Sequence, residues 1–224
     1  MASAHQRSGD AMVRRSALMI SVLAASSLVA TAAGARDRSF QETMAPAAIA
    51  ESTPTLAPFQ HVRFCLRNPS ECKSDPTGEE RIGWYPETAQ LLDRVNRAVN
   101  TEIAPTVKSY GSDLRSGWQI APTIGDCNDY AVTKRHELTQ SGLPARALRL
   151  AVVKTPSGVG HLVLVVATTK GDIVLDNLTA AILPWQQTGY QWLKIQSASD
   201  ARFWYSVKAP ALATGDQAMR LARR

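Results

Sequence analysis

Three runs rich in Val, Ile and Leu follow one another closely in the second half of the chain, over residues 147–153, 161–168 and 172–178. The Thr-Lys-Gly segment between the last two runs is typical of a hairpin turn. Two shorter runs, residues 190–195 and 203–207, continue the series. Neighbouring runs joined by short turns favour antiparallel pairing, so this part of the chain predicts a small antiparallel sheet.

Two helical patterns precede these runs. Over residues 86–103, apolar side chains recur three and four positions apart, as on one face of a helix. A second helix is predicted to begin at Asp126 or Cys127 and to end near Gln140, where glycine and proline follow. Helices that come first and strands that come after them indicate an α+β fold.

The N-terminal part of the chain has the composition of an export signal. A basic pair is followed by a mostly apolar stretch and then by small residues, so residues 1–35 are predicted to be a signal peptide that is cleaved before Arg36. The apolar stretch is shorter than the ~20 residues of a bilayer span, which argues against a permanent anchor. Residues 36–60 are expected to be a flexible leader, residues 61–208 the folded domain, and residues 209–224 a basic tail. These features predict a periplasmic or secreted protein with no stable membrane span.

The charge of the chain is mildly basic and scattered. Removing residues 1–35 takes away three arginines and one aspartate and lowers the formal net charge from +6 to about +4. Aromatic residues are not interleaved with Lys and Arg, as they are on a surface that binds nucleic acid. We therefore expect no nucleic-acid partner.

The three cysteines divide into a pair and a single residue. Cys65 and Cys72 lie in a polar, turn-rich stretch, and export to an oxidising compartment favours a disulfide between them. Metal binding is the alternative, although no second Cys/His pair follows at zinc-like spacing. Cys127 remains as an odd thiol, and a free thiol in an oxidising compartment suggests that it has a chemical role.

Cys127 lies in the first turn of its predicted helix, within the sequence Gly-Asp-Cys-Asn-Asp-Tyr. The free amides and positive dipole end of a helix stabilise a thiolate, and the same amides can hold an oxyanion. The alternative is a buried structural cysteine, but the polar neighbours argue against an apolar site.

His161 and Asp176 are the best partners for this thiol. His161 begins one apolar run after a Gly-Val-Gly segment, and Asp176 ends the next, so the two are expected to be neighbours or diagonal neighbours on one face of a hairpin. His136 is half a turn out of phase with Cys127 and more than ~10 Å along the helix, so it cannot reach the thiol. Asp172 is the rival acid, but it lies beside the turn, far from His161. The set matches a nucleophile, a base and an orienting acid.

Beyond these residues, the whole segment from Phe64 to Trp204 resembles the bacterial transglutaminase-like cysteine peptidases. The motifs that carry the resemblance are Gly-Asp-Cys-Asn-Asp-Tyr-Ala around Cys127, Gly-His-Leu-Val-Leu at His161 and Val-Leu-Asp-Asn-Leu at Asp176. Pro-Trp and Gly-Tyr pairs farther along the chain resemble the family too. The resemblance implies a papain-like, transglutaminase-type core, with the nucleophile helix packed on the sheet, and implies the triad roles of these three residues.

The resemblance also suggests a cofactor and a substrate. Some members are periplasmic, calcium-dependent proteases that trim surface adhesins, and their calcium site uses acidic residues around the nucleophile. Asp126 matches such a position, but Asn128 stands where those proteases carry a glutamate, so calcium is a possible cofactor whose use the sequence leaves open. A protein substrate in the cell envelope, such as an adhesin, is the expected partner, and Trp118 is a candidate substrate-binding residue.

The sequence therefore predicts an exported thiol hydrolase that cleaves a peptide or amide bond through an acyl-enzyme. Amide crosslinking by a transglutaminase reaction is the first alternative, because both reactions share every step up to the acyl-enzyme. A non-catalytic envelope-binding domain is the second, but such a domain has no need of a free thiol.

Overall fold

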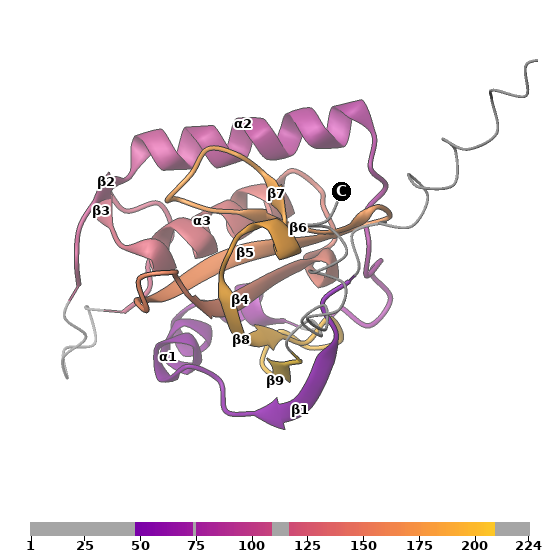
Figure 1. Cartoon of the computed structure of the whole chain (residues 1–224), viewed down its shortest axis with the longest axis horizontal. Helices are drawn as coiled ribbons and strands as arrows, with labels where there is room; N and C mark the ends of the chain where they lie inside the picture. The colour runs from indigo at the N-terminus through magenta and orange to yellow at the C-terminus, as the bar shows by residue number, and fades with distance from the viewer. Residues whose placement is uncertain (1–47, 74, 109–116, 209–224) are drawn as a thin grey trace, which may run out of the picture. The chain divides into compact units, whose positions relative to one another are not determined.

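A computed structural model describes residues 48–73, 75–108 and 117–208, and Figure 1 shows how their elements are arranged. The predicted signal peptide and basic tail, and the first part of the predicted leader, lie outside the described residues. No helix of the described ranges is long and apolar enough to cross a membrane.

Three α-helices are present in these ranges: α1 Phe59–Arg67, α2 Pro86–Glu102 and α3 Cys127–Gln140. The predictions for α2 and α3 are confirmed to within a residue. Short 3-10 helices are η1 Pro69–Cys72, η3 Ala145–Ala147 and η4 Trp185–Gln187. Helix α3 packs against β5 and β4 of the sheet, and α2 packs on α3 (Figure 1).

The sheet has seven strands in the order β1-β9-β8-β4-β5-β6-β7, and all its neighbours pair antiparallel. Its strands are β1 Glu51–Thr55, β4 Leu148–Lys154, β5 Gly160–Thr168, β6 Gly171–Leu175, β7 Leu183–Pro184, β8 Gln191–Gln196 and β9 Trp204–Val207. A separate parallel pair joins β2 Ala104–Pro105 to β3 Ile124–Gly125. The predicted α+β class with an antiparallel sheet is confirmed.

Both faces of the sheet are covered, which explains why its central strands are continuous apolar runs. Leu162, Leu164 and Val166 of β5 belong to a core that includes Leu92 and Leu138 of the helices. The alternate residues of β5, together with Trp185 and Trp192, form a second core on the other face. The sequence had indicated a smaller sheet, because the short strands β1 and β7 carry no apolar pattern of their own.

The N-terminal boundary of the folded part differs from the prediction. The leader was expected to span residues 36–60. The last part of this range is folded, because β1 pairs with β9 and α1 begins at Phe59. All five residues of β1 are exposed, so the strand is held by backbone pairing at the sheet edge and not by burial of side chains. Such a strand has no hydrophobic periodicity for sequence analysis to detect.

Candidate active site

Cys127 is the first residue of α3, and the turn that carries it is held by a capping box. The Asp126 carboxylate accepts a hydrogen bond from the Asn128 amide at 3.0 Å, and the Asp129 carboxylate accepts one from the Asp126 amide at 2.8 Å. These bonds satisfy amides that a helix start leaves free. The half-buried thiol of Cys127 is therefore fixed at the positive end of the helix.

Gly125 is required by this turn. A Cβ atom on Gly125 would lie 2.8 Å from Asp129 Cβ and 3.0 Å from a methyl carbon of Ile103. Both contacts are too close, so only glycine lets the segment before Cys127 lie against these side chains.

His161 and Asp176 meet as the hairpin pattern predicted. The register pairs Leu164 with Leu175, which places Asp176 two residues from the position opposite His161 and on the same face. The protonated His161 Nε2 donates to Asp176 Oδ1 at 2.8 Å, and both side chains are buried. This bond fixes the imidazole tautomer and leaves Nδ1 for a second partner.

The charge of the His161 ring is stabilised by its neighbours. Burial disfavours the charged ring, but hydrogen bonds with Asp176 and Cys127 and the charges of both outweigh burial and raise the pKa of His161 to about 9. Burial likewise opposes the charged form of Asp176, but the hydrogen bond and charge of His161 outweigh it and lower the pKa of that carboxyl. The electrostatics favour an imidazolium held against a carboxylate at neutral pH.

Tyr190 is a neighbour of this pair that sequence reasoning did not assign. Its hydroxyl donates to Asp176 Oδ2, and its ring lies edge-on to the His161 ring with the centroids 5.7 Å apart. Gly189, with a φ of 69°, turns the chain just before it. Asn100 of α2 donates to the Asp176 carbonyl at 2.9 Å, so side chain and backbone of Asp176 are both held.

Lys134 is a second unassigned neighbour. It lies two helical turns after Cys127 on α3 and is buried, and its Nζ has no hydrogen-bond partner within the described part of the chain. Burial lowers the pKa of Lys134 to about 7, although the nearby Asp176 charge opposes this shift. Its amine adds a titrating charge close to the acid of the site.

A cleft of about 320 Å³ gives access to these groups. Cys127 and His161 line it together, and Trp118 lies on its wall beside Phe59 of α1. Trp118 is only 3% exposed and also packs on Phe64, so most of its surface belongs to the core. Trp118 is therefore mainly a core residue that also lines the cleft.

The two rivals named from the sequence lie elsewhere. His136 Nδ1 is 2.6 Å from a Glu71 oxygen, away from Cys127. Asp172 is fully buried and accepts from Arg149 at 2.7 Å, in an ion pair unrelated to His161. The structure thus brings His161 and Asp176 together beside Cys127 and leaves both rivals out.

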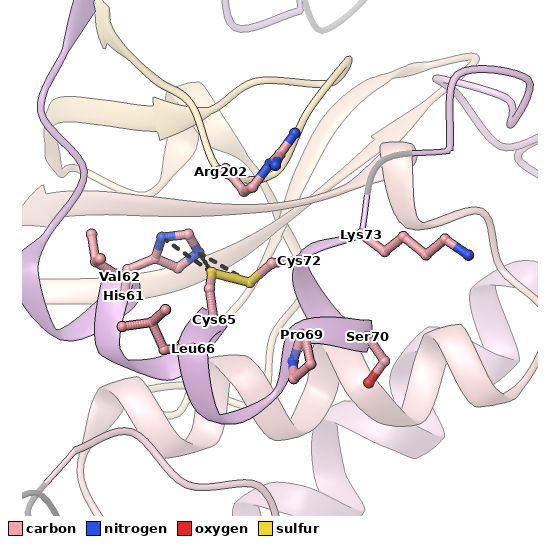
Figure 2. A pocket seen from close by; sticks show the side chains of 9 residues that line it. All are labelled: His61, Val62, Cys65, Leu66, Pro69, Ser70, Cys72, Lys73 and Arg202. Carbon is pink, nitrogen blue, oxygen red and sulfur yellow. Dashed lines mark hydrogen bonds between the residues drawn. A yellow bond between two sulfur atoms is a disulfide. The ribbon is translucent and has the colours of Figure 1, made fainter.

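Cys65 and Cys72 are joined by a disulfide, with Cα atoms 5.5 Å apart. Figure 2 shows His61 directed toward the two sulfurs, beside a cavity of about 800 Å³. His61 Nε2 lies 3.5 Å from Cys65 Sγ and 4.0 Å from Cys72 Sγ. These three residues are the one group of potential metal ligands found in the described part of the chain, but the disulfide leaves neither sulfur as a thiolate.

Comparisons with known proteins identify a family and a set of solved structures that this chain resembles. A model of the family described as bacterial transglutaminase-like cysteine proteinase BTLCP matches residues 51–211. Among solved structures, LapG of Legionella pneumophila is similar at 21% identity, covering 74% of this chain and 89% of that chain with a TM-score of 0.42. A calcium-bound LapG has the same identity and TM-score and covers 75% of this chain and 92% of that chain. No curated protein matches the chain.

Proposed function

The chain belongs to the bacterial transglutaminase-like cysteine proteinases, and from this membership we propose that it cleaves peptide bonds with Cys127 as nucleophile, His161 as acid and base, and Asp176 as the orienting group. The enzyme is a cysteine peptidase. The observation that carries the assignment is the 2.8 Å His161–Asp176 bond, made at the cleft that Cys127 also lines.

The proposed reaction begins with the Cys127 thiolate and the His161 imidazolium. The sulfur attacks the carbonyl carbon, and the negative oxygen of the tetrahedral intermediate is held by the backbone amide of Cys127, which the capping box does not use. His161 gives its proton to the leaving nitrogen, the C–N bond breaks, and a thioester remains on Cys127. His161 then takes a proton from water, the hydroxide attacks the thioester, and the product acid leaves with the thiolate regenerated.

Trp118 is proposed to contact the substrate from the cleft wall, because it lines the cleft that Cys127 also lines. The substrate is a protein, and we propose one of the cell envelope, such as an adhesin, from the family resemblance and the export signal predicted from the sequence. An oxidising compartment such as the periplasm agrees with the Cys65–Cys72 disulfide. Crosslinking remains a second outcome of the same acyl-enzyme, if an amine attacks in place of water.

Calcium was suggested by the family resemblance, with Asp126 and Asn128 as ligands. When bound at such a site, calcium would supply positive charge near the helix start. In this chain the Asn128 side-chain amide donates to Asp126 Oδ1 at 3.1 Å, so it faces this carboxylate as a donor and not as a ligand. No step proposed above depends on the ion.

The test compares the mature protein with Cys127→Ala. The wild type is expected to react with a thiol-directed electrophile much faster than a free thiol peptide near neutral pH, and to cleave envelope proteins, whereas Cys127→Ala does neither. Slow labelling of the wild type would contradict the activated nucleophile. Fast labelling with amine incorporation and no cleavage would favour crosslinking, and mass spectrometry of the products separates the two reactions.

A further inference from the structure

The side-chain amine of Lys108 lies against the first turn of α3, the turn that carries Cys127. Lys108 Nζ lies 2.5 Å from Asp129 Oδ2. The Asp129 side chain is fully buried, and only 16% of the Lys108 side chain is exposed. The pair is therefore largely shielded from water. Away from water, the attraction between opposite charges is stronger.

The fold brings Lys108 to this place through the small parallel pair. Strand β2 pairs with β3, which ends two residues before Cys127. The Thr106 amide donates to the Gly125 carbonyl at 2.9 Å and continues this pairing toward Lys108. The lysine is thus delivered by backbone pairing from a segment that lies about twenty residues before the nucleophile helix.

The same carboxylates do not present a calcium site. Calcium takes six to eight oxygen ligands, usually with several carboxylates among them. Here Asp129 Oδ1 accepts from the Gln119 amide at 2.8 Å, Asp129 Oδ2 accepts from the Asp126 amide at 2.8 Å, and Asp126 Oδ1 accepts from the Asn128 amide at 3.0 Å. Three of the four carboxylate oxygens therefore already face N–H donors, and Lys108 adds a positive charge that would repel a cation.

We propose that Lys108 is a built-in cation that takes the place of calcium in this chain. Its ammonium neutralises Asp129, and Asp129 in turn holds the amides of Asp126 and Gln119 on either side of the nucleophile turn. Lys108 is a positioning residue that acts on Cys127 through Asp129. The proposal depends on the proposed function only in taking Cys127 as the nucleophile, whose alkylation rate is one of the two quantities measured.

The test measures the thermal unfolding midpoint and the alkylation rate of Cys127, with chelator and with added calcium. Neither quantity is expected to respond to chelator or calcium in the wild type. Lys108→Met is expected to slow alkylation by about tenfold, since one largely buried ion pair is lost. Calcium is expected to raise the unfolding midpoint of Lys108→Met, because the positive charge that repels the ion is gone and each carboxylate oxygen keeps a second lone pair for it.

Two further variants serve as controls. Lys108→Arg keeps the charge and should restore calcium-independent alkylation, and Lys170→Met removes an exposed lysine in the β5–β6 turn and should behave like the wild type. The proposal is overturned if chelator slows alkylation of the wild type and calcium restores it, or if Lys108→Met matches the wild type with and without calcium. If Lys108→Met does not fold, the wild-type and Lys108→Arg measurements still decide. Unfolding and alkylation need no peptide cleavage, so a failure of the proposed proteolysis is seen separately.

Discussion

At the scale of single residues, the Asp176 carboxylate is shared between two side-chain donors. His161 uses Oδ1, and the Tyr190 hydroxyl uses Oδ2. The Leu178 amide also donates to Oδ1 at 3.0 Å, so the carboxylate keeps its place even without the tyrosine. Tyr190 therefore acts mainly on the charge of Asp176: its hydrogen bond draws negative charge away from the oxygen that faces His161.

This sharing predicts a specific effect of Tyr190→Phe, which removes the hydroxyl and keeps the ring. The Asp176 carboxylate would hold the His161 proton more strongly, and a less acidic imidazolium protonates the leaving amine less readily. We expect kcat/KM to fall by about tenfold, from a charge-assisted hydrogen bond worth ~1.5–3 kcal/mol. The alkaline limb of the pH profile, set in the wild type by the His161 pKa of about 9, should move to higher pH.

A purely structural role for Tyr190 would lower the unfolding temperature and leave the pH profile where it is. Tyr205→Phe on β9 is a matched control, because Tyr205 pairs with β8 and β1 and takes no part in the site. An unchanged alkaline limb in Tyr190→Phe would contradict the proposed sharing of charge.

The helix start at Cys127 and the proximity of His161 and Asp176 could be predicted from the sequence, and the reason is local. Cys127 is marked by the helix start, and His161 and Asp176 by hairpin register, so each follows from short-range pattern. Tyr190 and Lys108 act through contacts with parts of the chain 14 and 21 residues away, and nothing in their own neighbourhoods indicates a partner.

At the scale of elements, too, the sequence predicts what depends on local pattern and misses what depends on distant contacts. The apolar runs and the two amphipathic helices were predicted because their buried side chains recur in the sequence at the spacing of a strand or a helix. Helix α1 was missed, because a buried His61 and Arg63 occupy inward positions where apolar side chains were sought. Its inward polar face can be recognised only when the groups that it meets are known.

Helix α1 also carries a prediction about the disulfide. The disulfide joins α1 to η1, while the other end of α1 supplies Phe59 and Gln60 to the cleft wall. The double variant Cys65→Ser with Cys72→Ser should lose about 2 kcal/mol of unfolding free energy, the value for closing so short a loop. We expect KM to rise while kcat changes little, because α1 lines the cleft and carries none of the three proposed catalytic residues.

Denaturant unfolding with and without a thiol reductant checks this prediction. The reductant should destabilise the wild type to the level of the double variant and leave the variant itself unchanged. Equal stability of the oxidised and reduced wild type would contradict a stabilising role for the bond.

At the scale of the whole molecule, His61 connects several distant parts of the chain. It is 1% exposed and lies beside the disulfide. Trp204 of β9 donates to its Nδ1 at 3.2 Å, and its ring is 5.7 Å from the Trp118 ring at the cleft. Gln196 of β8 lies 2.9 Å from its Nε2. The Nδ1 atom accepts the Trp204 bond, and a proton added at Nδ1 would break it, so this environment disfavours the charged ring.

This environment predicts how the fold responds to acid. Burial and the nearby Arg135 charge lower the pKa of His61 from 6.5 to about 4. Because the folded state resists protonation and the unfolded state accepts it, the stabilising contribution of neutral His61 is complete above pH 6.5 and is lost as the pH falls toward 4. The loss is about 3 kcal/mol of unfolding free energy over this range.

His61→Gln tests the prediction, because glutamine can accept the Trp204 bond and does not titrate. Denaturant unfolding of both proteins between pH 8 and pH 4 gives the difference between their unfolding free energies. The carboxylates and Lys134, which is charged over most of this range, are present in both proteins, so their contributions largely cancel in this difference. We expect this difference to shrink steadily below about pH 6.5 as protons enter the unfolded wild type. A difference that stays constant with pH would mean that His61 is protonated equally in the folded and unfolded states. Any loss of stability in acid would then come from other titrating groups.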